Sequence, residues 1–429
     1  MSAYRHPMQT TLTDMTVTVL GAGMVGVCAA LELQARGAQV TLIDRRAPGQ
    51  ETSYGNAGVI ARSSLMPLNN PGLWSSLPKL LGNRSAGLRY SLPFMLRNAG
   101  WACGFLGHAR MAPFLETAQA MDGLINLSYP IPKRLLAEAG ALDRLRETGW
   151  IYLYRTRTLF EGGAFGREML GTFEVATEVL DKSGLRDLEP GLNPIFDQAF
   201  WIKDAMSVNA PGRVVEAYAK VFTVRGGRIE QTSVASLTPL DGRWLVNTEK
   251  GPFQTDRVVV ALGPWSRTFL ERAGMRVPMA YERGYHMHYT GADTDGNLPL
   301  TRPIYDVAGG YVLSPMEDGL RMTTGVELTD CDAPPNHAQL DLAEASARQA
   351  IDLGERRDKT PWLGRRPTFA DSRPVIGQAP GRAGLYLAFG HQHVGFNTGP
   401  GTARLLADIM EGTSPDIPAE PFSPARFIR

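Results

Sequence analysis

The feature of this sequence that most restricts its fold is the turn GAGMVG at residues 21–26. A β-branched apolar run precedes the turn, and Val25–Gln34 suits a helix. In such a unit Gly21 permits the tight turn, Gly23 lets a pyrophosphate approach the backbone, and Gly26 lets the helix pack closely on the sheet. The helix N-terminus offers N–H groups and a positive partial charge to phosphates. The unit therefore predicts a Rossmann-like dinucleotide-binding fold.

The second strand of this unit ends in a carboxylate. Val40–Ile43 is apolar, and Asp44 follows it, in the place where a carboxylate bonds a ribose hydroxyl. An arginine at that position would instead indicate a 2′-phosphate. Arg45 and Arg46 come next, and we interpret them as solvated or phosphate-facing charges.

Size, charge and cysteine usage narrow the class of protein. With 429 residues the chain exceeds one ordinary core, so we expect two intergrown domains. The net charge of +1 gives no reason to expect a nucleic acid partner. Cys28, Cys103 and Cys331 form neither a disulfide framework nor a zinc pattern, and the N-terminal residues through Asp14 lack the apolar run of a signal peptide. We expect a cytoplasmic protein, with peripheral contact to the inner membrane left open.

Later segments alternate between two kinds of pattern. The stretch from Pro67 to about Leu188 looks mostly helical, and short strands follow, with a hairpin turn at Asp241-Gly242. Near the C-terminus we expect a glycine-containing loop over Gly390–Gly399 and a helix over Thr402–Met410, with Pro400 just before the helix.

The predicted fold class is α/β. It combines a discontinuous, Rossmann-like cofactor domain with a substrate-binding domain built on an antiparallel sheet and helices. We expect the cofactor domain to comprise residues 15–66, 205–275 and 365–429. The substrate-binding domain then comprises residues 67–204 and 276–364.

The loop after the nucleotide-binding unit bears on the choice between NAD and FAD. Residues 51–58, ETSYGNAG, are small and expose many backbone groups. Such a loop suits close approach to a flat ring system, because its backbone N–H groups can bond the polar edge of the ring. Taken alone, the loop also fits an ordinary surface turn, although less well.

Several motifs together resemble one family. They are the 21–26 turn, Asp44-Arg45, Thr52-Ser53, Asn56-Ala57-Gly58, VVVALGPWS at 258–266, Arg366-Pro367 and PVIG at 374–377. This set resembles the D-amino acid oxidase superfamily of FAD-dependent oxidoreductases, and within it the small-subunit type of bacterial D-amino acid dehydrogenase. The motifs are spread from the first strand to the last helix, so the resemblance covers nearly the whole chain.

The resemblance implies noncovalent FAD and a set of contacts to it. The final loop, residues 390–400, resembles the family's last flavin-contacting loop, and Pro264 stands where the family more often has alanine. The implied cofactor-binding residues are Gly21, Gly23, Met24, Val25, Gly26, Asp44, Arg45, Arg46, Thr52, Ser53, Asn56, Ala57, Gly58, Val234, Gly263, Trp265, Gly390, His393, Val394, Gly395 and Phe396.

The candidate substrate residues follow from the chemistry of amino acid oxidation. A substrate carboxylate calls for a planar bidentate donor, which is arginine. Arg366 resembles the family's carboxylate-binding arginine, and alternation along a strand would point Arg365 the opposite way. The implied reaction is hydride transfer from Cα to flavin N5, giving an imino acid and then a 2-oxo acid.

Three further residues are catalytic candidates. Tyr285 and His286 lie in a stretch that is most similar to proteins acting on hydroxyproline-like cyclic amino acids. Their side chains would face opposite sides of a strand, and either side could face the flavin. His391 lies in the final glycine loop, and we place it near the flavin. A metal site at His391 and His393 is disfavoured because no cysteine or acidic ligand accompanies them.

Alternative functions remain open on the sequence alone. The main interpretation is a dehydrogenase that passes electrons to a quinone or another carrier. The alternatives are an oxidase that uses oxygen on glycine, sarcosine or another N-substituted amino acid, a noncatalytic flavin-binding electron-transfer subunit, and an NAD-dependent dehydrogenase. Residues 67–107 mix aromatic and basic side chains, either as packing or as a surface for a membrane or partner subunit.

Overall fold

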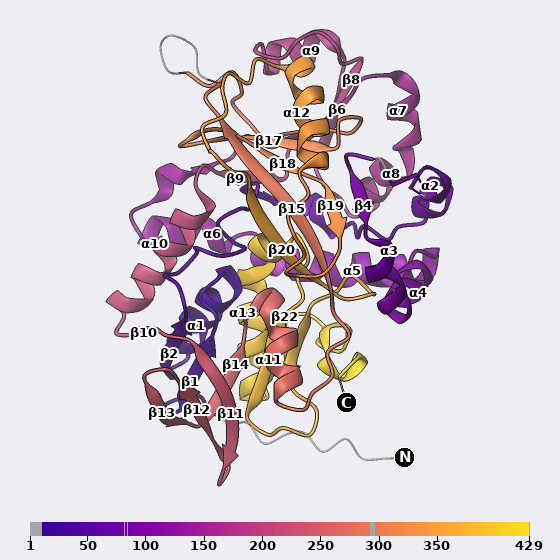
Figure 1. Cartoon of the computed structure of the whole chain (residues 1–429). Coiled ribbons are helices and arrows are strands. Elements are labelled where there is room, and N and C mark those ends of the chain that lie inside the picture. The colour runs from indigo at the N-terminus through magenta and orange to yellow at the C-terminus, as the bar shows by residue number, and fades with distance from the viewer. Residues whose placement is uncertain (1–10, 81, 84, 292–296, 429) are drawn as a thin grey trace.

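The computed structural model describes residues 11–80, 82–83, 85–291 and 297–428, so most of the expected N-terminal tail lies outside the described residues. Two main sheets confirm the predicted α/β class (Figure 1). The first, the cofactor sheet, has the strand order β10-β2-β1-β14-β22-β21, and all neighbours run parallel except β21 and β22. In that order the strands span Arg228–Gln231, Gln39–Asp44, Thr16–Leu20, Arg257–Val260, Leu385–Phe389 and Val375–Gln378.

Both faces of the cofactor sheet are covered, which explains why all residues of its central strands β1 and β14 but the first are buried. Alternate side chains pack against helices α1 (Met24–Ala35) and α13 (Gly395–Glu411) on one face. On the other face lies a small sheet of β11 (Val234–Leu240), β12 (Arg243–Thr248) and β13 (Gly251–Thr255). The predicted hairpin joins β11 to β12, with positive φ angles of 44° at Asp241 and 78° at Gly242.

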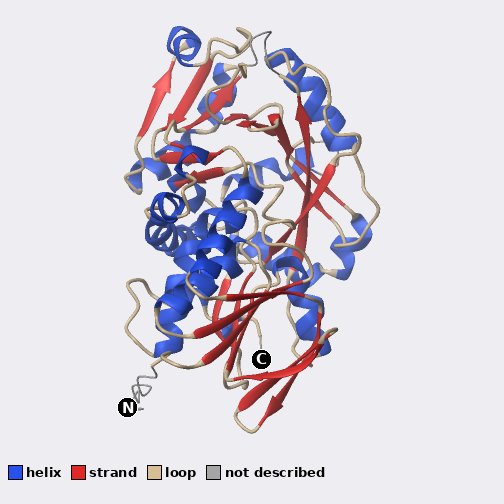
Figure 2. Ribbon diagram, turned by 90° about the vertical axis from the view of Figure 1, so that its left-hand side faces the viewer, coloured by secondary structure: helices blue, strands red, loops and turns tan. Residues whose placement is uncertain are grey.

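The second main sheet, the large sheet, supports the other half of the molecule. Its order is β4-β19-β15-β18-β17-β16-β6-β8-β7, and β20 pairs with β15 in antiparallel register. In the order given, with β20 last, the strands span Leu88–Tyr90, Val326–Leu328, Ala280–Tyr289, Gly319–Thr324, Tyr311–Met316, Ile304–Asp306, Trp150–Tyr154, Gln198–Ile202, Thr177–Leu180 and Trp362–Thr368. Figure 2 shows this sheet in the upper half of the molecule and the cofactor sheet in the lower half.

The remaining elements connect and cover the two sheets. A third small sheet consists of β3 (Val59–Ala61), β9 (Ala205–Val208) and β5 (Leu145–Arg146). The other helices are α2 (Gly72–Leu80), α3 (Leu92–Arg97), α4 (Ala99–His108), α5 (Met111–Ser128), α6 (Ile131–Glu138), α7 (Arg157–Gly162), α8 (Ala164–Thr172), α9 (Lys182–Leu188), α10 (Pro211–Val224), α11 (Ser266–Arg272) and α12 (Ala338–Ala350). Within the described ranges, every helix is too short or too polar to cross a membrane.

Two expectations about elements need correction. The helix predicted from Thr402 begins at Gly395 instead and passes through Pro400. Close packing outweighs the lost proline N–H bond, since a Cβ at Gly399 would lie 2.9 Å from Met24 Cγ and one at Gly401 would lie 2.5 Å from the Leu124 carbonyl oxygen. The stretch predicted as mostly helical also supplies three strands of the large sheet, β4, β6 and β7, because aromatic and β-branched residues favour strands.

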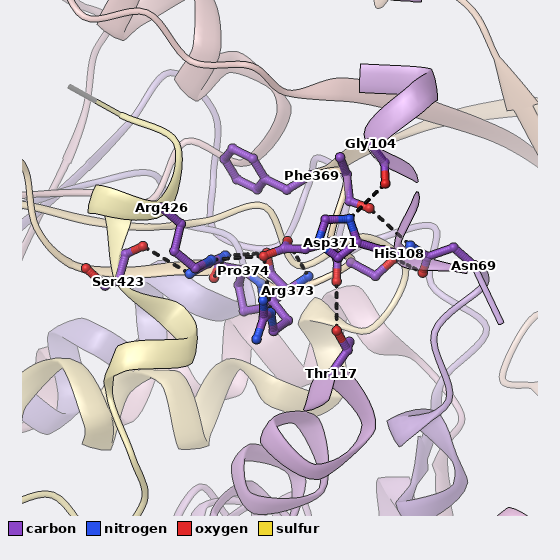
Figure 3. Close-up of polar contacts among 12 residues, drawn as sticks. Asn69, Gly104, His108, Thr117, Phe369, Asp371, Arg373, Pro374, Ser423 and Arg426 are labelled. Carbon is purple, nitrogen blue, oxygen red and sulfur yellow. Dashed lines mark hydrogen bonds and ion pairs between the residues drawn. The ribbon is translucent and has the colours of Figure 1, made fainter. Parts of the chain in front are cut away.

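A buried ion cluster fixes the segment between β20 and β21 (Figure 3). The Asp371 carboxylate accepts hydrogen bonds from Arg426 Nε at 2.9 Å and from Arg373 Nε at 3.1 Å. The backbone carbonyl of Asp371 accepts a bond from Thr117 of α5 at 3.2 Å. These contacts tie the C-terminal segment to α5 and to the loop that follows β20.

Candidate functional site

A cavity of about 620 Å³ lies between the two main sheets and collects most of the predicted site residues. It is lined by the carboxyl ends of the cofactor-sheet strands and by one side of the large sheet. The predicted residues on its wall are Gly21, Gly23, Met24, Val25, Asp44, Arg45, Thr52, Ser53, Asn56, Ala57, Val234, Gly263, Trp265, Tyr285, Arg366, Gly390, His391, His393, Val394, Gly395 and Phe396.

Four predicted residues are not on the cavity wall. Gly26 is needed for packing, because a Cβ there would lie 1.8 Å from the Gly21 carbonyl oxygen. Gly58 has a φ of +74°, and a Cβ there would meet the Val208 carbonyl oxygen at 2.4 Å. The Arg46 side chain is 61% exposed, and His286 is covered by its neighbours. A ligand in the cavity would therefore not contact these four residues directly.

The nucleotide end of the cavity is shaped by the glycine turn. Gly21 has a φ of +107°, and a Cβ there would lie 2.3 Å from the Ala261 carbonyl oxygen, so only glycine fits. The Met24 N–H at the start of α1 donates to Ser53 Oγ at 3.0 Å, which fixes the helix end against the following loop. Because the glycines carry no side chains, the backbone of this turn is open to the cavity and leaves room for a pyrophosphate.

Asp44 stands at the same end of the cavity. Its two carboxylate oxygens accept hydrogen bonds from the N–H groups of Ala22, at 2.7 Å, and Arg46, at 3.0 Å, which orient the group. Burial raises its pKa above the ordinary range. Beside it, the Arg45 guanidinium lies 4.3 Å from the centre of the Trp265 ring and pairs with Glu51 at 2.8 Å. A ribose and an adenine would fit between these groups and the backbone at Val234.

Arg321 of β18 fixes the loop over residues 51–58 by hydrogen bonds to the backbone of the loop. Its Nη1 donates to the carbonyl oxygens of Tyr54 and Asn56, each at 2.8 Å, and its Nε donates to His288 Nε2 at 2.9 Å. The Nδ1 of His288 in turn bonds the Asp358 carboxylate at 2.8 Å. We call Arg321, His288 and Asp358 the loop clamp. Sequence reasoning missed this clamp, because its members come from three distant segments.

The loop clamp also explains a group of side chains with metal-ligand geometry. One ligand atom from each of His286, His288 and Asp358 lies within 4.8 Å of the others. Both ring nitrogens of His288 are engaged, however, one by Asp358 and the other by the cationic Arg321. Without a free lone pair on His288, these residues form a hydrogen-bond chain and offer no cation site.

Arg366 reaches the cavity from β20, while Arg365 faces the other side of the strand. Arg365 Nε donates to the Cys331 carbonyl oxygen at 2.8 Å, and only Arg366 is on the cavity wall. The Arg366 guanidinium lies against Gly284, where a Cβ would be 2.5 Å from Nη2, and Nη1 donates to the Gly325 carbonyl oxygen at 3.3 Å. The alternation predicted for the two arginines is thus present.

The charge of Arg366 is not neutralised by an ion pair with any carboxylate among the described residues. Burial lowers the pKa of its guanidinium, and the neighbouring Glu282 acts in the opposite sense. Glu282 is buried too, and desolvation raises its pKa to about 7. A desolvated guanidinium at a cavity wall is a binding group for a ligand carboxylate.

Tyr285 and His286 of β15 point to opposite sides, as alternation requires. The Tyr285 hydroxyl donates to Glu327 at 3.0 Å and accepts from the Asn336 N–H at 2.8 Å. His286 stacks on Trp362 with ring centroids 4.8 Å apart, and its Nδ1 lies 3.4 Å from the Gly55 carbonyl oxygen. The histidine side of β15 therefore faces the loop over residues 51–58, and Trp362 was missed by sequence reasoning.

The final glycine loop closes the cavity beside β20. Gly390 has a φ of +88° and packs on Phe369, and the Gln392 N–H donates to the Pro367 carbonyl oxygen at 2.9 Å. His391 Nε2 lies 2.9 Å from Thr402 Oγ1, and burial lowers the pKa of the imidazole to about 3. Burial also lowers the pKa of His393, to about 4. Both histidines are therefore neutral at physiological pH, beside the N-terminus of α13.

The chain is similar to known proteins over nearly its whole length. A family model described as "DAO: FAD dependent oxidoreductase" matches residues 16–409. A D-amino-acid oxidase from Bradyrhizobium diazoefficiens is 31% identical over 422 residues, which cover 96% of this chain and 99% of that protein. A D-amino acid dehydrogenase from Rhizobium johnstonii is 28% identical over 432 residues, covering 96% of this chain and 100% of that protein.

Solved structures share the fold at lower identity. Glycine oxidase from Geobacillus kaustophilus has a TM-score of 0.71 and 20% identity, covering 96% of this chain and 98% of its own. L-Proline dehydrogenase from P. horikoshii has a TM-score of 0.72 and 19% identity, with the same coverage of 96% and 98%. At these identities the likenesses show a shared fold.

Proposed function

The chain belongs to the DAO family of FAD-dependent oxidoreductases, and we propose that it oxidises the C–N bond of a D-amino acid or of a cyclic amino acid such as proline or hydroxyproline. The observation that carries this proposal is Arg366, a desolvated cation on the wall of a cavity that also contains the nucleotide-binding turn. Bound FAD would supply, at its N5 atom, the acceptor for the hydride that leaves the substrate Cα.

Residues of the cofactor sheet and of the loops beside it would hold FAD on their side of the cavity. The glycine turn and the N-terminus of α1 would bind the pyrophosphate, and Asp44 would bind the ribose. Backbone groups of the loop over residues 51–58 and of the final glycine loop would contact the ring. All three cysteines lie within the described residues and none of them is on the cavity wall, and this supports noncovalent binding.

The chain's contribution to the chemistry is mainly positioning. Arg366 would bind the substrate carboxylate with two hydrogen bonds and so orient Cα toward the ring. The hydroxyl of Tyr285 and the ring of His286 are occupied elsewhere, so we give these two residues a structural role. His391 would support the ring-contacting loop through Thr402.

The experiment that tests the proposal is anaerobic bleaching of the purified yellow protein by a panel of D-amino acids, L-amino acids, proline derivatives and N-methyl amino acids. We expect a D-amino acid or a cyclic amino acid to bleach the flavin. If no member of the panel does so, the protein is a noncatalytic flavoprotein and the proposal is wrong.

Paired variants test the role of Arg366. Each charged hydrogen bond contributes about 1.5–3 kcal/mol, so Arg366→Leu should lower kcat/KM by roughly 100-fold or more without changing the flavin spectrum. Arg365→Leu is the matched control, because its side chain bonds Cys331 on the other side of β20. Equal losses in the two variants would contradict the assignment.

We further propose a quinone or another carrier as the electron acceptor, in line with the relatives named dehydrogenases. The alternative acceptor is oxygen, and the relative named D-amino-acid oxidase supports it. Stopped-flow reoxidation of the reduced protein in air-saturated buffer separates the two, because fast reoxidation would identify an oxidase.

A further inference from the structure

One wall of the cavity is a continuous cross-strand row of the large sheet. Thr323 of β18 pairs with Val312 of β17, and Val312 pairs with Tyr305 of β16. Directly opposite residues in a ladder share a face of the sheet. Thr323, Val312 and Tyr305 are on the cavity wall, so this row leads away from Arg366 along the cavity.

The large-sheet part of the cavity wall carries a single charge. Among the described residues in the strands of this sheet, Arg366 is the one charged residue that lies on the cavity wall. The other charged residues on the wall, Asp44, Arg45, Glu51 and Arg272, belong to the nucleotide-binding segments and to α11. A second charge on a ligand would therefore be desolvated here without a partner, which is costly.

The far end of the row is aromatic and offers two polar atoms. The Tyr305 and Trp150 rings both pack edge-on against Tyr152, with centroid distances of 5.2 Å and 4.7 Å. Tyr305 and Trp150 are themselves on the cavity wall. The indole N–H of Trp150 is buried and has no hydrogen-bond partner within the described part of the chain. Burial raises the pKa of the Tyr305 hydroxyl to about 12, so this group stays neutral.

The separation between the two ends sets the size of the ligand. Arg366 is bonded to the Gly325 carbonyl, directly after β18, and Tyr305 lies two strands away, on β16. Two strand spacings of about 4.8 Å, combined with the offset of about 7 Å between Gly325 and Thr323, give roughly 12 Å between the backbone positions. Glycine or sarcosine bound at Arg366 would leave this distance empty, whereas a large side chain would reach the aromatic end.

On the basis of the proposed amino acid oxidation, we propose that the preferred substrates carry a large, neutral, aromatic side chain that packs against Tyr305 and Trp150. The substrate carboxylate lies at Arg366, and the side chain follows the row past Val312. A phenolic oxygen at the end of the side chain accepts a hydrogen bond from the Trp150 N–H. Side chains with a charge of either sign are rejected.

The test measures anaerobic flavin reduction by phenylalanine, tyrosine, alanine, glycine, aspartate and lysine, with both enantiomers of each chiral amino acid. Within the enantiomer series that the protein accepts, we expect the aromatic substrates to exceed alanine and glycine by at least about tenfold in rate constant over half-saturation concentration. Aspartate and lysine should be slower than the aromatic substrates by at least about 100-fold.

Variants locate the preference in the aromatic end. Tyr305→Ala should reduce the preference for phenylalanine over alanine by at least about fivefold, and Trp150→Phe should reduce the preference for tyrosine over phenylalanine. Trp74→Phe is the matched control, because Trp74 is exposed on α2 and bonds the Ala109 carbonyl oxygen. An unchanged flavin spectrum verifies that each variant retains its fold.

The outcomes separate this inference from the function on which it rests. If glycine, aspartate or lysine reduces the flavin as fast as phenylalanine does, the inference is overturned and amino acid oxidation stands. If Tyr305→Ala leaves the ratio of phenylalanine to alanine unchanged, the aromatic end is not the side-chain site. If no amino acid reduces the flavin, the proposed function fails and the inference fails with it.

Discussion

Replacing Arg321 by methionine should weaken FAD binding although Arg321 is absent from the cavity wall. The side chain is 3% exposed and bonds three acceptors, the carbonyl oxygens of Tyr54 and Asn56 and the Nε2 of His288. Methionine fills similar volume and bonds none of them. Each buried polar group left unpaired costs about 1–3 kcal/mol, so three groups cost at least ~3 kcal/mol.

This free energy is shared between folding and ligand binding. A loss of ~3 kcal/mol equals roughly 100-fold in an equilibrium constant. The part of this cost that the apoprotein already bears does not affect FAD binding, and the rest weakens it. We therefore expect the Kd for FAD to rise by between about tenfold and 100-fold. Arg321→Lys, which keeps the charge but loses the planar fork, should fall between the native protein and Arg321→Met.

Titration of apoprotein with FAD, followed by quenching of flavin fluorescence, measures this Kd directly. The control is Arg357→Met, since the Arg357 side chain lies on the surface, where its Nη1 donates to the Asp318 carbonyl oxygen. A Kd for Arg321→Met within about threefold of the native value would refute the reasoning, because the bonds from Arg321 would then not hold the loop over residues 51–58 in its FAD-binding position. So would an equal effect in Arg357→Met.

Three further changes follow from the structure. Asp371→Asn leaves two partly buried arginines without their buried carboxylate and should lower the free energy of unfolding by about 3 kcal/mol in urea titrations, whereas Asp330→Asn, in an exposed pair, should change it by less than about 1 kcal/mol. Burial lowers the pKa of His391 to about 3 from its ordinary 6.5, so the unfolded chain takes up a proton below pH 6.5 that the folded protein excludes. The contribution of His391 to the free energy of unfolding is complete above pH 6.5 and falls as the pH drops toward 3, by up to ~1.4 kcal/mol per pH unit. His391→Asn should therefore reduce the slope of the free energy of unfolding against pH between pH 7 and pH 5. Gly26→Ala should abolish FAD binding, because its Cβ would lie 1.8 Å from a backbone oxygen, whereas Gly107→Ala on α4 meets nothing within 4 Å and should stabilise the protein by about 1 kcal/mol in the same titrations.

The parts of the site that could be predicted from the sequence depend on local geometry. The glycine turn, the Asp44 position and the alternation of Arg365 and Arg366 each follow from the conformation of one short segment. A strand, a turn and a helix of known spacing bring these groups to a cavity wall without knowledge of the rest of the chain. The same holds for the hairpin at Asp241-Gly242.

The parts that could not be predicted depend on pairing between distant segments. Arg321 meets His288 only because β15 and β18 have one particular register, and Trp150 reaches the cavity because β6 lies next to β16. The path of α13 through Pro400 depends on how closely α1 and α5 approach it. No pattern within a single segment carries this information, since it arises from tertiary packing.

The order in which the segments occur along the chain bears on how the protein is made. The cofactor sheet takes its strands from the beginning, the middle and the end of the sequence, and β22 and α13 complete the cavity wall. A nascent chain emerges from the ribosome from its N-terminus. The glycine turn is therefore synthesised early but has no complete ligand site until some 400 residues have been translated. FAD insertion is thus a post-translational step, and the nascent chain must keep its unpaired central strands from aggregating until β22 arrives.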